Sequence, residues 1–185
     1  MIMDCSDYYK VAEAFICMRE YDLAYLYYKK YIDLCNKENA GAWHGLGITL
    51  QHKRMFRESK EAYKKALELH LKENSPSGYL WGAWSAININ DYKLAYELVK
   101  KSIEMDPDYS YSWKTLYIIA RKLNLDGYEK YRERYESMIK EKPYQKRECE
   151  GLKMLLELKN KWDEELKKIF ENLITKEKYR DCGKI

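Results

Sequence analysis

The sequence predicts an all-α fold built from antiparallel helix pairs that follow one another along the chain. Three observations predict it: a composition poor in strand formers and chain breakers, apolar residues at helical spacing, and a repeat of about 35 residues. The 185 residues include only 8 Gly, 3 Pro, two Val and three Thr, which disfavours sheet-based folds. Apolar residues make up 46% of the chain and charged residues 35%, a balance typical of folded proteins rather than disordered ones.

The repeat is clearest in residues 40–73. Apolar side chains recur there at i, i+3, i+4 and i+7 in two runs, which is the helical period. Trp43 opens the first run, and a polar Lys-Arg pair separates it from the second. The small residues Gly47 and Ser59 let two helix backbones approach, while bulky residues such as Tyr63 fill the space around them. This unit therefore predicts an antiparallel helical hairpin.

The same pattern recurs three more times. Because no single hairpin buries both of its faces, the copies are expected to stack on one another. Pro107 and Pro143 follow the second helices of their copies, where Pro stops a helix. The other copies span residues 5–38, 76–109 and 110–145, and the four polar turns are expected at 19–20, 53–54, 88–91 and 124–127.

This arrangement resembles the tetratricopeptide repeat family. The pattern of Trp, Leu-Gly, an apolar residue, then small-x₃-aromatic and a closing Pro matches best in residues 40–73, and the resemblance covers about three quarters of the chain. Tyr31, Tyr131 and Met138 depart from it, because they stand where small residues are usual. The resemblance implies a right-handed α-solenoid, a tetratricopeptide-like superhelix whose first helices line a concave, peptide-binding face.

The C-terminal stretch is also helical in pattern. We expect residues 146–178 to form a degenerate fifth hairpin with a polar outer face that caps the stack. A single capping helix is the alternative, and Asn160 favours a break between two helices. Residues 179–185 are expected to be a frayed tail.

The resemblance also implies which residues face a bound peptide. The middle of this face is apolar and aromatic, and its end in the fourth repeat is basic and suited to a carboxylate or a phosphate. An alternative stays open, in which Trp84 and Ile118 pack against adjacent hairpins as core. By template position the peptide-binding candidates are Tyr9, Glu13, His44, Ile48, His52, Leu80, Trp84, Asn88, Tyr111, Lys114, Ile118, Arg121 and Lys122.

Net charge disfavours a dedicated nucleic-acid binder. The chain carries +4 overall, with 34 Lys/Arg and 30 Asp/Glu. Residues 113–185 hold most of the excess base, so RNA or DNA binding through this half is a third hypothesis. No secretory leader and no apolar stretch long enough for a bilayer is visible, so no membrane partner is predicted.

The five cysteines are odd in number and include no C-x₂-C pair. This count predicts neither a disulfide framework nor a zinc site, and we expect reduced thiols in a cytoplasmic protein. Cys17 and Cys35 are expected to be buried structural thiols.

No motif for catalysis is present. The three histidines form no metal-ligand pattern, and no phosphate-binding loop or nucleophile motif occurs. We therefore predict no catalytic residues, no metal and no cofactor. The leading hypothesis is a non-enzymatic scaffold that binds a peptide segment of another protein. The alternative is a structural subunit that forms a homodimer, or docks into a larger complex, through its hairpin edges.

Overall fold

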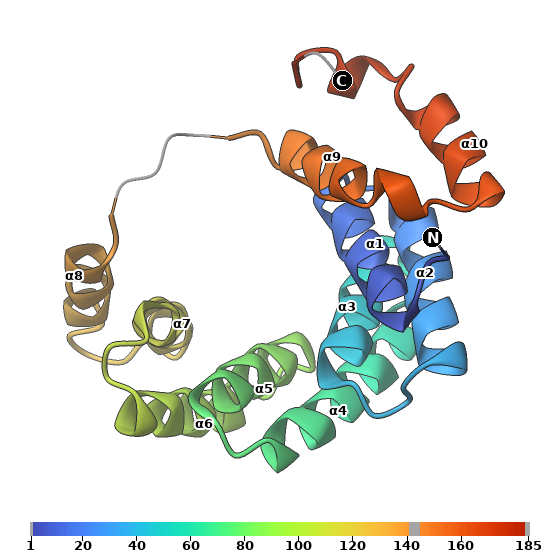
Figure 1. The fold of residues 1–185 in the computed structure, drawn as a ribbon. Helices are drawn as coiled ribbons and strands as arrows, with labels where there is room; N and C mark the ends of the chain where they lie inside the picture. Colours follow the sequence, from blue (N-terminus) through green and yellow to red (C-terminus); the bar gives the residue numbers. More distant parts are fainter. Residues whose placement is uncertain (1, 141–144, 184–185) are drawn as a thin grey trace. The chain divides into compact units, whose positions relative to one another are not determined.

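A computed structural model describes residues 2–140 and 145–183, and every regular element in these residues is a helix (Figure 1). The described residues fall into two compact units, here called unit 1 (residues 2–37, 48–55 and 145–183) and unit 2 (residues 38–47 and 56–140). The α-helices are α1 (Cys5–Cys17), α2 (Tyr21–Leu34), α3 (Ala40–His52), α4 (Phe56–Lys72), α5 (Pro76–Asn88), α6 (Tyr92–Met105), α7 (Ser110–Lys122), α8 (Glu129–Met138), α9 (Arg147–Glu157) and α10 (Glu164–Leu173). Two short 3₁₀ helices are η1 (Lys159–Lys161) and η2 (Glu177–Tyr179).

The first helix of each predicted hairpin ends in the same way. A residue in the left-handed region follows it: Arg19, Arg54, Asn90 and Asn124 have φ of 58°, 63°, 64° and 53°. The next residue then donates its backbone N–H to the carbonyl five residues earlier, which closes the helix end. These bonds run from Glu20 to Phe15, Met55 to Leu50, Asp91 to Ala86 and Leu125 to Ala120, at 2.9, 2.9, 2.9 and 3.0 Å. The predicted helix pairs are thus confirmed, and the same turn geometry connects the two helices in each of the four pairs.

Small residues hold the helices of unit 2 close together. Ser59 Oγ on α4 donates to the carbonyl of Gly47 on α3 at 2.8 Å. A Cβ atom added to Gly47 would lie 2.9 Å from the buried ring of Tyr63. The packing role predicted for these residues is confirmed. Further along, α5, α6 and α7 share a core of Leu80, Ala83, Ala86, Ala95, Leu98, Val99, Leu116 and Ile119.

Helix starts in unit 2 follow local capping chemistry. Ser75 accepts the N–H of Gly78 at 3.0 Å, and Pro76 fixes the first turn of α5. Asp91 accepts the N–H of Leu94 at 3.1 Å and begins α6. Both caps set where the helices that carry the candidate site begin.

Unit 1 combines the first hairpin with the C-terminal segment. Helix α9 packs directly on α1, where Gly151 allows the closest approach. A Cβ added to Gly151 would lie 2.6 Å from the Ala14 carbonyl oxygen and 2.8 Å from Cys17 Cβ. Leu152 and Leu155 are buried on the same helix. Helix α9 thus gives α1 a second packing partner besides α2.

This packing corrects the expected place of the C-terminal segment. We expected residues 146–178 to cap the stack beyond the fourth hairpin, but they form part of the same compact unit as α1 and α2. The segment holds two α-helices, α9 and α10, and Asn160 lies in the 3₁₀ turn between them.

The expected frayed tail is also wrong for its described part. Tyr179 is only 1% exposed and donates its hydroxyl to Glu20 at 2.9 Å. Lys178 donates to the carbonyl of Met18, the C-cap of α1, at 2.8 Å. The tail therefore closes the end of α1. Residues 184–185 lie outside the described residues, as does Pro143, which was expected to end the fourth repeat.

The expectation of reduced thiols is wrong as well. Cys5 and Cys35 form one disulfide, and Cys149 and Cys182 form another. Each bond joins the start of a helix to a residue 30 or 33 positions later, so it fastens the open end of a folded-back segment. The paired cysteines come together only because the chain folds back, so no short cysteine spacing in the sequence indicates the two disulfides. Cys17 is free and half-buried.

Candidate functional site

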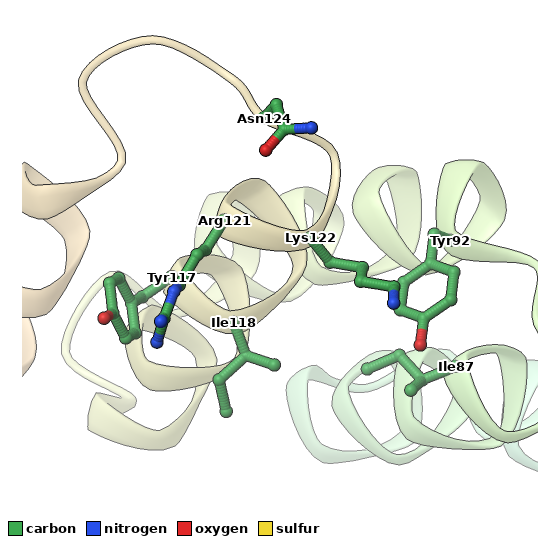
Figure 2. A pocket seen from close by; sticks show the side chains of 7 residues that line it. All are labelled: Ile87, Tyr92, Tyr117, Ile118, Arg121, Lys122 and Asn124. Carbon is green, nitrogen blue, oxygen red and sulfur yellow. The ribbon is translucent and has the colours of Figure 1, made fainter.

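A hollow of about 390 Å³ lies between α5 and α7 in unit 2 (Figure 2). Ile87 from α5 and Ile118 from α7 supply its apolar walls, and Tyr92, the first residue of α6, stands beside Ile87. The hollow is open to solvent and larger than a single side chain. Its lining residues are Ile87, Tyr92, Tyr117, Ile118, Arg121, Lys122 and Asn124.

A chain of hydrogen bonds fixes α5 against α7. Trp84 Nε1 donates to Thr115 Oγ1 at 3.1 Å, and the Thr115 hydroxyl donates to the Tyr111 carbonyl at 2.8 Å. Asn88 Nδ2 donates to the Trp84 carbonyl at 2.8 Å. We call the surface that α5 and α7 share the α5–α7 face, and a pair of residues at the same height on the two helices a level. Trp84 and Thr115 form one level. Ile87 and Ile118, each three residues further along, form the next.

Two cations stand at the edge of the hollow. Arg121 and Lys122 occupy the exposed last turn of α7. Lys122 Nζ lies 5.6 Å from the centroid of the Tyr92 ring, and Figure 2 shows its chain extending toward that ring. Across the residues that the structure describes, neither cation is in an ion pair with a carboxylate. The hollow therefore combines an apolar interior with a positive edge.

Five predicted residues gather at this place. Ile118, Arg121 and Lys122 line the hollow, while Trp84 and Asn88 support its wall. Trp84 is half-buried against the core with its indole N–H bonded, so for this residue the packing alternative describes its role better than a free anchor.

Two further candidates of unit 2 lie on α7 but outside the hollow. Lys114 lies over the ring of Tyr135 on α8, at 5.6 Å. Tyr111 is 57% exposed in the first turn of α7.

His44 and Leu80, two of the predicted peptide-binding residues, are both buried. Their exposed fractions are 7% and 2%. His44 Nδ1 lies 2.9 Å from Ser85 Oγ, and burial, helped by neighbouring His70, lowers the pKa of His44 to about 3. The ring of Trp81 lies 5.4 Å from that of His44 and has 44% of its surface exposed, so Trp81 is the residue that meets solvent there.

The candidates in unit 1 are engaged with neighbours of their own unit. The Glu13 carboxylate accepts the Tyr28 hydroxyl, and burial raises the pKa of Glu13. Tyr9 packs its ring 5.4 Å from that of Tyr31. His52 is exposed and stacks on Tyr21 at 4.1 Å, and Ile48 is half-buried. None of these four residues lines the hollow.

Four lining residues escaped the sequence analysis: Ile87, Tyr92, Tyr117 and Asn124. Ile87 carries a usable signal, since it stands three residues after Trp84 as Arg121 stands three after Ile118. Tyr92 belongs to a second helix, and a search confined to first helices misses it. Asn124 lies in the turn after α7 and was counted only as a turn former.

Other classes of site find little support in the described residues. Among them, no three His, Cys, Asp or Glu side chains are grouped so as to hold a metal ion. No helix within the described ranges is long and apolar enough to cross a membrane.

The fold and this site can be compared with known proteins. Residues 40–70 match the tetratricopeptide repeat family. The structure is similar to that of YrrB, a TPR protein with an unusual peptide-binding site, with a TM-score of 0.51 and 18% identity over 73% of this chain and 69% of that one. It is also similar to that of MamA, with a TM-score of 0.52 and 18% identity over 98% of this chain and 96% of that one. No curated protein sequence matches the chain.

The protein is therefore all-α, built of sequential helix pairs, and has the fold of tetratricopeptide-repeat structures. Residues 40–70 match the tetratricopeptide repeat in sequence, and the chain has the fold of tetratricopeptide-repeat structures. Proteins of this family generally mediate protein–protein interactions and are typically not enzymes.

Proposed function

We propose that this chain is a protein-interaction scaffold that binds a peptide segment of another protein on the α5–α7 face of unit 2. The hollow between Ile87 and Ile118 is the observation that carries the proposal. It takes one bulky apolar side chain of the partner, which leaves water on entering it. Arg121 and Lys122 attract negative charge on the same segment.

The described residues support binding better than catalysis at this place. The hollow contains two cations, two tyrosines, an amide and apolar side chains, but no carboxylate or histidine. General acid–base catalysis most often uses a histidine or a carboxylate. Such a set suits recognition, where an apolar pocket with a few polar groups fixes a ligand's position.

The experiment is affinity capture with a matched pair of variants. The chain with Ile118→Asp places a charge inside the hollow, whereas Lys93→Asp makes a charge change at an exposed site on α6. Baits of wild type and both variants are incubated with extract of the source cell, and the bound proteins are quantified by mass spectrometry. A partner that is retained by Lys93→Asp and lost with Ile118→Asp supports the proposal.

Retention by all three baits would contradict it and would favour docking through hairpin edges instead. Light scattering on the same samples tests the homodimer alternative, because self-association through hairpin edges would raise the mass of wild type and of both variants equally. A cytoplasmic location stays a proposal, but reduced thiols no longer support it, since disulfides persist mainly in oxidising compartments.

A further inference from the structure

We infer that the partner of this face is an acidic segment in extended conformation, with one apolar residue for the hollow, an Asp or Glu about two positions away, and a second apolar residue about three positions to the other side. This inference rests on the proposed function and names the chemistry of its partner. It follows from the register of α5 and α7 and from the different character of the two ends of their shared face.

The register gives the face an order of levels. The bond from Trp84 to Thr115 sets one level, and the hollow between Ile87 and Ile118 lies one turn further along both helices. Each helix is followed by an antiparallel partner, so α5 and α7 run parallel and the levels continue in both directions. One turn before Trp84 lies Trp81, and one turn before Thr115 lies Tyr111.

The two ends of the face differ in chemistry. At the N-terminal end Trp81 and Tyr111 leave 44% and 57% of their surface exposed, and the Trp81 ring lies 5.4 Å from that of His44 on α3. Exposed aromatic side chains on a rigid helix suit a second apolar contact. At the C-terminal end Arg121 and Lys122 stand exposed. The Asp91 carboxylate, which precedes Tyr92 in the sequence, caps α6 and accepts the N–H of Leu94.

Helix geometry sets the spacing of the partner's residues. From the level of Tyr111 to Ile118 a helix rises about 10 Å, and from Ile118 to Lys122 about 6 Å. An extended peptide advances about 3.3 Å per residue. The aromatic end therefore lies about three residues from the hollow, and the cations lie about two residues from it on the other side.

Charge selects the acidic segment over a neutral or basic one. A carboxylate near Arg121 and Lys122 gains two favourable contacts, while a lysine there would face two like charges. The carboxylate comes from an Asp or Glu side chain or from the free C-terminus of the partner. Both sources share the chemistry, and the test includes an arm for each.

The experiment selects peptides from a phage-displayed library of random eight-residue sequences, in one arm with blocked and in the other with free C-termini. Four proteins are used as bait: wild type, Ile118→Asp, the double variant Arg121→Glu with Lys122→Glu, and Lys93→Asp as the control. Circular dichroism of each bait verifies that the helices are intact. Selected sequences are then synthesised and titrated by fluorescence anisotropy at low and high salt.

We expect wild type and Lys93→Asp to enrich peptides that pair an apolar residue with Asp or Glu about two positions away. The double charge reversal should lower the affinity for these peptides at least tenfold at low salt. In the selection, the same variant should enrich basic residues at the position of the Asp or Glu. High salt should reduce the preference, because the two cations are exposed.

Two outcomes separate the inference from the function it rests on. Peptides that bind through Ile118 but show no acidic preference, or are unaffected by the double reversal, would overturn the inference and leave the proposed function standing. A folded wild-type bait that enriches no peptide in either arm, or enriches the same peptides as Ile118→Asp, would overturn both.

Discussion

The two units of this chain hold their helices together by different means. Unit 2 relies on small residues and short polar bonds between neighbours in sequence, such as Ser59 to Gly47, 12 residues apart. Unit 1 relies on contacts between the two ends of the chain. Lys161 reaches Asp7 at 3.2 Å and Lys176 reaches Glu20 at 2.9 Å, across separations of 154 and 156 residues. Two disulfides also lie in unit 1, and none occurs in the described residues of unit 2.

The difference shows which helices are stabilised by neighbouring hairpins and which by contacts from distant parts of the chain. An inner hairpin is covered by its neighbours, so its own small and large side chains suffice. In unit 1, helix α1 is covered instead by α9, by the tail and by the bonds to Glu20. Burial opposes ionisation of Glu20, yet hydrogen bonds from Lys178, Lys176 and Tyr179 lower its pKa below the usual value. Unit 2 in turn keeps its α5–α7 face open.

The strongest way to break the comparison is to reduce the disulfides. A disulfide that closes a loop of 30 or 33 residues adds roughly 4 kcal/mol to the free energy of unfolding. We expect dithiothreitol to raise amide hydrogen exchange in α1, α2 and α9 by large factors, and to leave α5 to α7 unchanged. Thiol titration of the denatured chain should find one thiol per molecule before reduction and five after it. A count of five without reductant would remove this distinction between the units.

Acid should act on unit 2 before unit 1. Burial lowers the pKa of His44 to about 3 and that of His70 to about 4. The folded state thus binds fewer protons than the unfolded state below about pH 6.5, and stability falls as the pH drops from there toward 4. For His44 alone, the free energy of unfolding falls by about 3 kcal/mol between pH 6.5 and 4.

Tryptophan emission can follow this loss, since four of the five tryptophans belong to unit 2. Urea midpoints should fall between pH 6.5 and 4.5, and His70→Leu should reduce the fall, because it removes a ring whose two nitrogens are buried without hydrogen-bond partners. Unit 1 should resist in this range, since the lowered pKa of Glu20 costs stability only below about pH 4.5. If amide hydrogen exchange showed that both units lose stability in parallel over this pH range, the expectation would be contradicted.

Three glycines sharpen the comparison through steric fit. Gly47→Ala in unit 2 pushes a methyl group to 2.9 Å from the buried Tyr63 ring, and Gly151→Ala in unit 1 pushes one to 2.6 Å from a backbone carbonyl. Both should cost about 1–3 kcal/mol. Gly82→Ala is the matched control, because its new methyl group meets only ordinary contacts at 3.5 Å and beyond. It should be neutral or stabilising by up to about 1 kcal/mol in thermal unfolding. Equal costs at all three positions would exclude the close-approach explanation.

The smallest effect is expected at the repeated turns. Arg54 holds a φ of 63°, which is unfavourable for a residue with a side chain, so Arg54→Gly should stabilise by up to about 1 kcal/mol. Asn90→Gly, at a φ of 64°, should gain less because Asn tolerates this region better. Calorimetric melting temperatures of the two variants test the order. If Arg54→Gly lowers the melting temperature, the left-handed turn is not the strained point that we describe.

Much of the fold is predictable because the repeat is local. The hairpins, their turns and the small residues at Gly47 and Ser59 all follow from side chains fewer than about 20 residues apart. The return of α9 to α1, the buried Tyr179 and both disulfides do not, because contacts across 30 to 160 residues impose no period on the sequence. Cysteine spacing was uninformative for the same reason.

The candidate site was predictable only in part. Ile118, Arg121 and Lys122 were found because template position places them on an exposed side of a first helix. His44 and Leu80 occupy the template position that Lys114 occupies in the fourth repeat, but they are buried, since the exact rotation of each helix decides which of two adjacent residues meets solvent. Trp81, next to Leu80, took the exposed place. Tyr92 was missed because the wall of the hollow includes the start of a second helix.

The most direct test of the central claim, that the α5–α7 face is the working surface, is methyl NMR of the full chain labelled at isoleucine. A peptide selected on wild type is titrated into the oxidised protein. We predict that the methyl signals of Ile87 and Ile118 shift in proportion to the bound fraction, while those of Ile32 and Ile169 in unit 1 do not move. Shifts confined to unit 1, with Ile118 unchanged at saturation, would contradict the account.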